Sequence, residues 1–512
     1  MPAVRMIPFA LLCYGLVAQV PTPPRSLTLK DAIQASLQNN LQVQIAKETR
    51  EYSGPANLSI AKGAFDWNIN GSVSLSSVDS TTTSIYANYD PRPTTTEATT
   101  KGRAFAAGLS KPFEWGGAFS ASYNANYSSR SGLYSIQNPS PTPDTTYALG
   151  TAKPYVGSLS ATYTQSLLRG FGRDVTGANL IVAQKGSLIA DYAYQLAIIN
   201  LVASTESAYW DVVYGQRNLE NKKVSLALAQ KQLKENQIRV EVGTLAPIEV
   251  TSAEATVAQR EQDIIAAEAQ FLNAKDALIR MLYPRTDQPS DIQTTDAPNI
   301  GHIALDEAGA VKMAMSRRVE LKSASLDLEA KRVLEKAATN RIKPQLDAFA
   351  TYTGGTDNYS SLGPVNTDLT GFKNPGYAVG LQFSMPLANH AAKGALSQAR
   401  ANARSSELNR LDQELGITLE VRTAIRNVEA AEKTVKAAEK TRVYREKDLD
   451  AEQKKFENGM STNFLVLSKQ NDLDTAKATE VQSQIAYAKA VTAFEKSVGN
   501  LLEARIPNAE MK

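Results

Sequence analysis

The chain has 512 residues, which is more than one hydrophobic core usually organises, so several domains or an elongated architecture is expected. Its 55 Lys and Arg residues nearly balance its 52 Asp and Glu residues, and the two signs are interspersed along the chain. The sequence therefore carries no basic stripe, which argues against nucleic-acid binding.

The first eighteen residues (1–18) are typical of an export signal, because Arg5 precedes a short apolar run that ends at Ala18. No later stretch reaches about 18 uninterrupted apolar residues, so no membrane-spanning helix is expected. The only cysteine, Cys13, lies in this segment. The alternative to removal of Cys13 with the signal is lipid attachment at Cys13. Lipid attachment requires a small residue before the cysteine, whereas Leu12 stands there. A mature chain without cysteine would suit an oxidising compartment.

Strict alternation of apolar and polar residues predicts strands with one apolar face and one polar, solvent-facing face. In the first half these strands cover 64–78 and 155–168, with an additional hairpin at 103–129. In the second half they cover 344–354 and 376–388. A tilted strand of about ten such residues crosses a bilayer core, which favours a transmembrane β-barrel. On the strands alone, a soluble β-sandwich whose apolar faces pack together stays open as the alternative.

Two very long helices are predicted at 177–242 and 392–458, and the first would extend about 100 Å at about 1.5 Å per residue. Each leads through a glycine turn, 243–246 or 459–461, into a return helix, at 247–282 or 462–502. Apolar residues along these helices keep an alternating spacing of four and three, which predicts coiled-coil packing. The second long helix shows this spacing at Ile417, Val421, Ala424, Val428, Ala431, Val435 and Ala438.

The return helices are shorter than their long partners, so part of each long seam is left uncovered. The upper helices predicted at 41–62 and 319–341 have about the missing length, and stacking them on the return helices would complete the partner. Each chain would then supply four helical tracks. Because four tracks enclose little space, several copies should assemble into a tube whose helices continue the strands of a shared barrel.

The same order of elements occurs twice, which indicates an internal duplication. The first structural repeat spans 19–283 and the second spans 302–504. A connector at 284–301, containing Pro and Asp, joins them, and a tail at 505–512 follows. The Ser-, Thr-, Pro- and Tyr-rich segments 79–101 and 130–154 lack apolar periodicity and are expected to be long extracellular loops.

Three sequence features carry a family resemblance: L-x-x-A-I from Leu29, the turns R-V-E-V-G and K-F-E-N-G, and Q-S-L-L-R-G-F-G from Gln165. With the duplicated order of elements, they resemble the TolC-type outer-membrane efflux protein family from about Leu27 to Leu502. The resemblance implies an α+β membrane protein, a trimeric transmembrane β-barrel continuous with a long α-helical coiled-coil barrel. It also implies a location in the outer membrane of a Gram-negative-type bacterium, surrounded by outer-membrane lipid and extending into the periplasm.

The resemblance further implies a passive exit duct of tripartite efflux or type I secretion, opened when a periplasmic adaptor protein and an inner-membrane pump dock at its tip. The adaptor would meet the turn residues Gly243, Thr244, Leu245, Gly459, Met460 and Ser461. A glycine at such a turn permits the left-handed backbone that a sharp reversal after a helix often needs. A plain helix stop is the competing interpretation, and both can hold.

The resemblance places a pore constriction at Glu249, Phe456, Leu465 and Ser468. Leu465 and Ser468 stand where well-known members carry acidic residues, and an apolar ring does not attract cations, so cation block is not expected. Glu249 is able to form a single acidic ring, or simply to interact favourably with its helix dipole. Phe456 has no hydroxyl group and cannot hydrogen-bond Glu249. We therefore expect coiled-coil packing to hold the resting tip closed.

The hairpin at 103–129 does not fit the family plan of two strands per repeat. Enlargement of the barrel by this hairpin and its projection above the barrel are the two alternatives. We favour projection or an upward extension of the strands, because two more strands per chain would mismatch the helical tube beneath.

Catalytic chemistry has little support in the sequence. His302 and His390 are far apart and lack the spaced ligands of metal sites, and the glycine-rich passages lack the order that cradles phosphate. We predict no enzyme activity, no metal and no cofactor. The alternative to a duct is a soluble or secreted coiled-coil scaffold, such as a periplasmic adaptor or an adhesin.

Overall fold

The computed structural model describes residues 25–86, 90–139, 141–151, 154–283, 292–303 and 306–506. They fall into two compact units, a helical unit (Met1–Thr49, Tyr192–Lys322 and Asp412–Lys512) and a sheet unit (Arg50–Asp191 and Ser323–Leu411). The expected export signal at 1–18, residues 284–291 of the connector and residues 507–512 of the tail lie outside the described residues.

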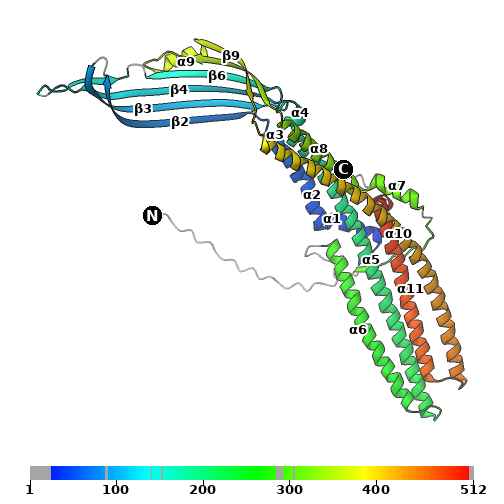
Figure 1. Ribbon diagram of the computed structural model, residues 1–512. Helices are drawn as coiled ribbons and strands as arrows, with labels where there is room; N and C mark the ends of the chain where they lie inside the picture. The colour runs from blue at the N-terminus through cyan, green and yellow to red at the C-terminus, as the bar shows by residue number, and fades with distance from the viewer. Residues whose placement is uncertain are drawn as a thin grey trace, which may run out of the picture. The chain divides into compact units, whose positions relative to one another are not determined.

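The sheet unit contains a long antiparallel sheet (Figure 1). Its strand order is β2 (Asn68–Tyr86), β3 (Asp90–Pro112), β4 (Gly117–Ile136), β6 (Tyr155–Ser166), β8 (Gln345–Gly355) and β9 (Pro375–Ser384). A short strand, β5 (Thr145–Gly150), pairs with the far end of β4. The path leaves β2 and β9 as its two edges.

The strand register sorts the side chains of this sheet onto two different faces, because directly paired residues share a face. One row across all the strands of the path is apolar: Ile69, Leu109, Ala121, Ala161, Tyr352 and Tyr377. The row beside it is small and mostly polar: Asn70, Gly108, Ser122, Ser160, Thr353 and Gly376. Large apolar side chains of the first face are uncovered, with Ile69 80% and Val379 85% exposed.

The expectation of long loops at 79–101 and 130–154 is wrong. β2 and β3 stay paired from Asn68↔Ser110 to Ile85↔Pro93, so 79–101 is mainly strand. The second segment contains the end of β4 and all of β5. Apolar periodicity misses such strands because Thr and Ser occupy both of their faces, and β-branched Thr suits a strand without any burial.

The hairpin expected at 103–129 does not project from the sheet. It is formed by β3 and β4, which lie between β2 and β6 and are paired on both sides.

A short helix, α9 (Leu362–Thr370), packs on the apolar face over β6 and β8. Its Val365 and Leu369 are buried. A Cβ atom on Gly157 of β6 would lie 2.6 Å from Val365 Cγ1 and 2.8 Å from Leu369 Cδ1, so the missing side chain makes room for the helix.

Four helical segments lie side by side in the described part of the sheet unit. In spatial order they are α3 (Gly54–Gly63), the start of α5 (Ala178–Glu241), α8 (Val319–Arg341) and the start of α10 (His390–Glu457). Arg50, just before α3, pairs with Asp191 of α5 at 3.0 Å. Lys185 of α5 pairs with Glu329 of α8. Ser406 of α10 donates to Asp327 of α8 at 2.6 Å. A short helix, α4 (Arg173–Thr176), precedes α5.

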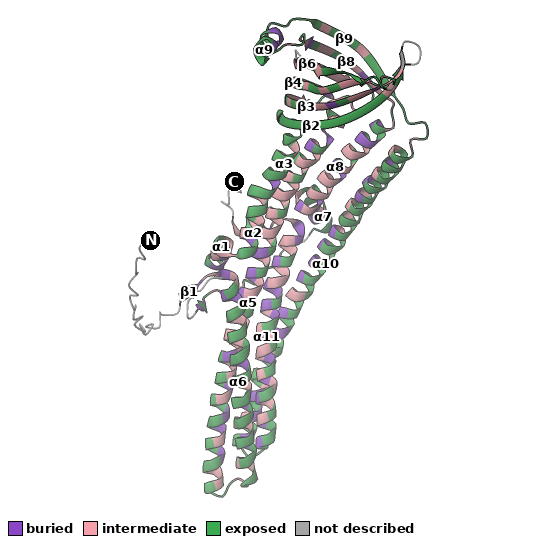
Figure 2. Cartoon of the chain, turned by 90° about the vertical axis from the view of Figure 1, so that its left-hand side faces the viewer, coloured by how far each residue is buried: buried purple, intermediate pink, exposed green. Residues whose placement is uncertain are grey.

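In the helical unit the neighbouring order is α6 (Ile248–Leu282), α5, α11 (Asn463–Val498) and α10. Lys222 of α5 pairs with Asp263 of α6 at 3.0 Å. Lys489 of α11 pairs with Asp211 of α5 at 2.6 Å, and α10 pairs with α11 through Arg442 and Glu480 at 2.7 Å. The predicted seam is buried, since Ile417, Val421, Val428 and Val435 are at most 4% exposed (Figure 2).

The return helices are joined to the upper helices by side-chain hydrogen bonds to the last carbonyl groups. Asn39 and Asn40, which precede α2 (Leu41–Glu48), donate to the carbonyl oxygens of Leu282 and Met281 at 3.1 and 3.2 Å. In the second repeat Arg318, which precedes α8, donates to the Ser497 carbonyl at 3.2 Å. These bonds satisfy groups that a helix end leaves without partners. The helix expected at 41–62 is α2 and α3 separated by a π-helical turn, Thr49–Ser53.

A small parallel pair, β1 (Arg25–Leu27) and β7 (Ile292–Thr294), packs beside α1 (Leu29–Asn39) against the middle of the helices. The Tyr209 hydroxyl lies 3.0 Å from the Leu27 carbonyl oxygen and 3.1 Å from Asp296 Oδ2. Burial raises the pKa of Tyr209 to about 12. Two further helices, α7 (Glu307–Arg317) and α12 (Leu501–Arg505), complete the described part of this unit.

Among the described residues α5 has a window of mean hydropathy 1.2 that satisfies a length and composition test for a membrane-spanning helix. A single helix of this kind is weak evidence for a membrane span. In the isolated chain 11% of the window is buried, so most of this apolar surface is uncovered.

We predict that Gly157→Val displaces α9, because the added side chain would overlap Val365 and Leu369. Overpacking of this kind costs about 1–3 kcal/mol. Limited proteolysis should show faster tryptic cleavage after Lys373, which follows α9. Gly150→Val is the matched control, since nothing lies within 4 Å of its Cβ position. Equal cleavage rates in the two variants would contradict the packing.

Candidate functional site

The α5–α6 and α10–α11 hairpins each end in a turn built around a left-handed glycine. Gly243 has φ 77° and Gly459 has φ 72°. In the first turn the Thr244 N–H donates to the Arg239 carbonyl at 2.8 Å, and in the second the Met460 N–H donates to the Lys455 carbonyl at 2.8 Å. Both turns are Schellman motifs, in which a side chain on the glycine would be strained.

The turns present most of the residues expected there to solvent. Gly243, Thr244, Gly459 and Met460 are exposed, with Met460 at 72%. Leu245 and Ser461 are half-buried. The Ser461 hydroxyl is already used, because it donates to Glu452, and together with Lys455 it lowers the pKa of the Glu452 carboxyl.

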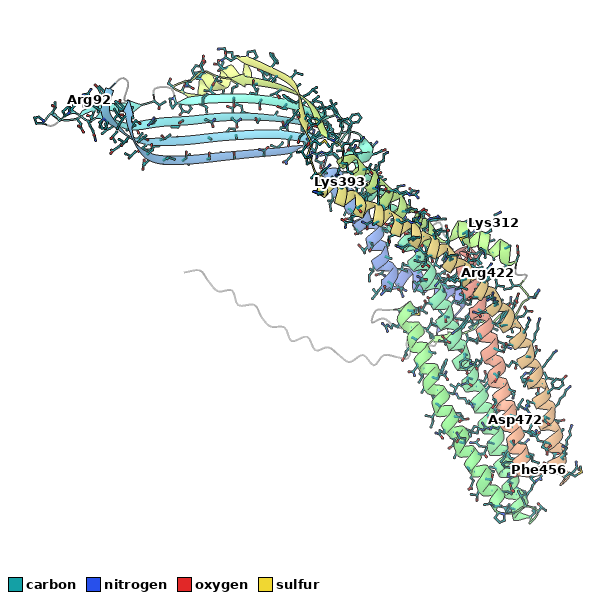
Figure 3. All side chains as sticks on the ribbon, in the orientation of Figure 1. Arg92, Lys312, Lys393, Arg422, Phe456 and Asp472 are labelled. Carbon is teal, nitrogen blue, oxygen red and sulfur yellow. The ribbon has the colours of Figure 1, made fainter. Side chains whose placement is uncertain are left out.

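The residues expected at a constriction divide into two groups. Leu465 is 42% exposed and Ser468 is exposed on the same helix, so both are available to face a lumen. Phe456 is 7% exposed and packs with Leu449, Val466 and Leu473 between α10 and α11. The guanidinium carbon of Arg239 on α5 also lies 4.6 Å from the centre of the Phe456 ring, so Phe456 has a packing role that reaches the other hairpin, and its part in a constriction stays a prediction. Figure 3 labels Phe456 near the end of this hairpin.

The fourth residue, Glu249, belongs to a polar cluster near the tips. Its Oε2 atom accepts from Asn463 Nδ2 at 3.0 Å. Gln232 Nε2 donates to Asn236 Oδ1 at 3.0 Å and lies 3.2 Å from Asn463 Oδ1. Gln232, Asn236 and Asn463 are at most 7% exposed. We name Gln232, Asn236, Glu249 and Asn463 the tip cluster; it joins α5 and α6 to α11, and so one hairpin to the other.

The tip cluster was missed in the sequence although a signal was present. On α5 the buried positions Ser225, Ala229, Gln232 and Asn236 keep the coiled-coil spacing, so the seam becomes polar towards the tip. Polar residues at seam positions specify register and partner at a cost in stability. The expectation that apolar packing holds the resting tip is therefore incomplete, because buried hydrogen bonds also hold the two hairpins together.

A second polar cluster surrounds Arg260, which interrupts the apolar seam of α6. Its guanidinium group pairs with Asp474 at 3.2 Å and Asp263 at 3.6 Å and donates to Asn471 at 3.3 Å. Burial acts to raise the pKa of the Asp263 carboxyl, but Gln259, Lys222 and Arg260 together lower it below its ordinary value. Arg260 is 7% exposed, so its charge is compensated inside the helical layer.

The described residues hold no group of three or more His, Cys, Asp or Glu side chains suited to a metal ion. His302 lies 3.2 Å from Glu432 on an exposed surface, and His390 is the first residue of α10.

The sequence matches the family described as outer membrane efflux protein over residues 118–282 and 310–500. The matched segments contain β4, β6, β8 and β9 and all of α5, α6, α8, α10 and α11, whereas β2 and β3 precede them. The chain is 23% identical over 328 residues to the outer membrane protein TolC of Vibrio cholerae serotype O1, covering 64% of this chain and 73% of TolC.

Three solved structures share the fold at low sequence identity. The outer-membrane channel OprN is 14% identical with a TM-score of 0.66, covering 92% of this chain and 90% of OprN. CusC, whose structures concern folding and transmembrane channel formation, is 14% identical with a TM-score of 0.66. The match covers 94% of this chain and 95% of CusC. The outer membrane channel MtrE of Neisseria gonorrhoeae is 15% identical with a TM-score of 0.63, covering 92% and 89%. These relatives are channels, in agreement with the expectation that the chain is not an enzyme.

We predict that Asn463→Leu loosens the contact between the two hairpins, because Gln232 and Glu249 lose a buried partner. Leaving such groups unsatisfied costs about 1–3 kcal/mol. Trypsin should then cleave faster after Arg239 in the purified protein. Asn458→Leu is the control, since Asn458 is exposed in the same turn. A cleavage rate that rises equally in both variants would show that the tip cluster does not hold the hairpins together.

Proposed function

The chain belongs to the outer membrane efflux protein family, and from this premise we propose that it forms the passive exit duct of a tripartite efflux or type I secretion system. In this proposal three copies share one barrel in the outer membrane. A periplasmic adaptor and an inner-membrane pump open the duct at its periplasmic tip.

The single observation that carries the proposal is the pair of rows across the sheet, one apolar and one small and polar. An uncovered apolar face suits lipid and a small polar face suits a water-filled lumen. The edges β2 and β9 would leave backbone groups without partners in lipid, where no water replaces them. A neighbouring copy, pairing its β9 with β2, satisfies both edges.

The helix α10, at the edge of the helical layer, also supports the assembly of several copies. Leu408, Leu411, Leu415 and Leu419 form a stripe on α10, and Leu415 is 71% exposed. Such spacing along one helix face is that of a coiled-coil contact. In the proposed trimer this stripe packs on the next copy.

Opening at the tip is supported by the difference between the seam inside the second hairpin and the seam between the two hairpins. Between α10 and α11 the seam near the tip is apolar, around Phe456 and Val466. Between the two hairpins the contacts are mostly polar or charged, and they include the tip cluster, the Ser225–Asp474 hydrogen bond, the Arg260–Asp474 ion pair and Arg239 stacked on the Phe456 ring. A polar seam can exchange its hydrogen bonds for bonds to water. The two hairpins therefore separate more readily than either one comes apart.

The alternative of a soluble coiled-coil scaffold is less favoured. A soluble sheet buries its apolar face, but here Ile69, Val379 and Leu381 are uncovered. A scaffold would also purify without detergent.

To test the tip, Thr244→Cys and Met460→Cys are each labelled with a photoactivatable maleimide in a cysteine-free Cys13→Ala background. We expect each to cross-link in cells to a periplasmic adaptor, because both side chains are exposed at the turns. Glu261→Cys, exposed in the middle of α6, is the control. The proposal fails if the tip positions give no adduct beyond the control and the protein is extracted without detergent.

We also predict that Leu465→Asp creates a cation-sensitive entrance. A ring of carboxylates from neighbouring copies attracts multivalent cations, whereas leucine does not. In planar bilayers multivalent cations added from the periplasmic side should reduce the conductance of Leu465→Asp and leave the parent protein unaffected. Glu249→Gln is the control for the other repeat. If the parent is blocked and Glu249→Gln abolishes the block, Glu249 forms the acidic ring instead.

A further inference from the structure

We propose that each chain contributes six strands to the wall of the outer-membrane barrel, so that three copies build an eighteen-stranded barrel. This inference rests on the proposed channel function. Its consequence is that the barrel is as wide as the helical tube that feeds it.

The first support is that the β3–β4 hairpin reaches the periplasmic end of the sheet. The Gly172 N–H donates to the Trp115 carbonyl at 3.1 Å, and the Ser166 N–H donates to the Gly116 carbonyl at 3.1 Å. Arg173 at the start of α4 pairs with Glu114 at 2.8 Å. The hairpin turn is thus fixed to the junction where β6 passes into the helices. A hairpin standing above the membrane would have no such contact.

The second support is that β3 and β4 carry the same two faces as the strands around them. On β3, Phe105 and Leu109 belong to the apolar face while Ala106 and Gly108 belong to the other. On β4, aromatic side chains mark two levels of the apolar face: Phe119 makes an edge contact with Trp67 at 6.0 Å, and Tyr127 makes one with Tyr155 at 4.9 Å. Aromatic girdles of this kind flank the apolar band of a membrane barrel. β3 and β4 are therefore built to cross the bilayer.

The third support is the width of the wall. Strands about 4.8 Å apart and tilted by 35–45° occupy about 6 Å of circumference each, so six strands occupy about 35–41 Å. The four described helical segments α3, α5, α8 and α10 lie side by side, and helices packed about 8–10 Å apart occupy about 32–40 Å. Four strands would occupy only about 23–27 Å.

The expected mismatch is therefore removed. At this tilt the six strands of one chain fit over its four helical tracks, so the width of the helical layer is no argument against them. The match does not depend on how many copies assemble, because strands and tracks multiply together. β2 and β3, which precede the residues matched by the family, account for the difference between four strands and six.

The inner face of this wall is lined mainly by small side chains. Along the paired strands it presents mostly Ser, Asn, Thr, Gly and Ala, and it also carries the charged residues Asp347 in β8 and Arg130 in β4. Asp347 is 8% exposed and accepts from Gln345 at 2.6 Å. Bulky side chains on the same face include Phe349 in β8, which is paired with Gly380 of β9, and Tyr134 in β4.

Cysteine labelling in the Cys13→Ala background tests the wall directly. The lumen-facing variants Ala106→Cys in β3 and Ser120→Cys in β4 should react with a membrane-impermeant maleimide in reconstituted vesicles. Their lipid-facing neighbours, Ala107→Cys and Ala121→Cys, should lose this reaction.

Ala378→Cys and Val379→Cys in β9 are the reference pair, since β9 lies within the matched family segment. If β9 alternates while the β3 and β4 pairs react equally on both faces, the hairpin stands in water and the six-stranded wall is overturned, although the channel stands. If β9 also fails to alternate, the proposed membrane channel itself is wrong.

End-on electron micrographs of the detergent-purified assembly give a second measurement that needs no substitution. Barrel diameter grows roughly linearly with strand number, so the proposal expects about 1.5 times the diameter of a twelve-stranded barrel. A diameter equal to that of a twelve-stranded barrel would overturn it.

Discussion

The backbone groups along the outer edges of β2 and β9 constrain the whole chain. In a bilayer each of these N–H and C=O groups must find a protein partner, because no water is present to replace it. The chain cannot satisfy them by itself, since β2 and β9 stand at opposite ends of the strand path. In the proposed assembly, closure by neighbouring copies fixes the circumference that each chain must fill. That circumference would serve strands and helices together, and the β2–β3 pairing would widen the share that this chain fills.

The helical layer meets a second requirement, that every long seam be covered. Helices of 64 and 68 residues are too long for a single return helix of 35 or 36 residues to cover. The upper helices complete the cover, and the joints are held by side chains that reach the last carbonyl groups. Asn39 and Asn40 do this in the first repeat and Arg318 does it in the second. Duplication has thus preserved the position of the joint while its chemistry has diverged from neutral amides to a charged guanidinium group.

The tips combine two kinds of seam. The two glycine turns are nearly identical in backbone, with φ 77° and 72°. The seam inside the second hairpin is closed by Phe456 and Val466, whereas the seam between the two hairpins contains buried amides and Glu249. Buried polar groups are stable only while all of their partners are in place, so a small displacement of one hairpin weakens several bonds together. This difference suits the proposed duct, in which the tip stays closed until a partner docks.

The sequence by itself determined the duplication, the long helices with their buried seams, the glycine turns and the two-faced strands. These features are periodic or local, and the residues that specify them lie within a few turns of one another. Only the tertiary structure decided that the described residues of 79–101 are strand, that β3 and β4 lie inside the sheet, and that Phe456 is buried. The strands of 79–101 pair with each other through Thr and Ser residues that carry no apolar alternation. The place of β4 beside β6 and the contacts of Asn463 with Gln232 and Glu249 depend on which segment lies alongside. Pairing between segments far apart in the chain leaves no periodic signal in either one.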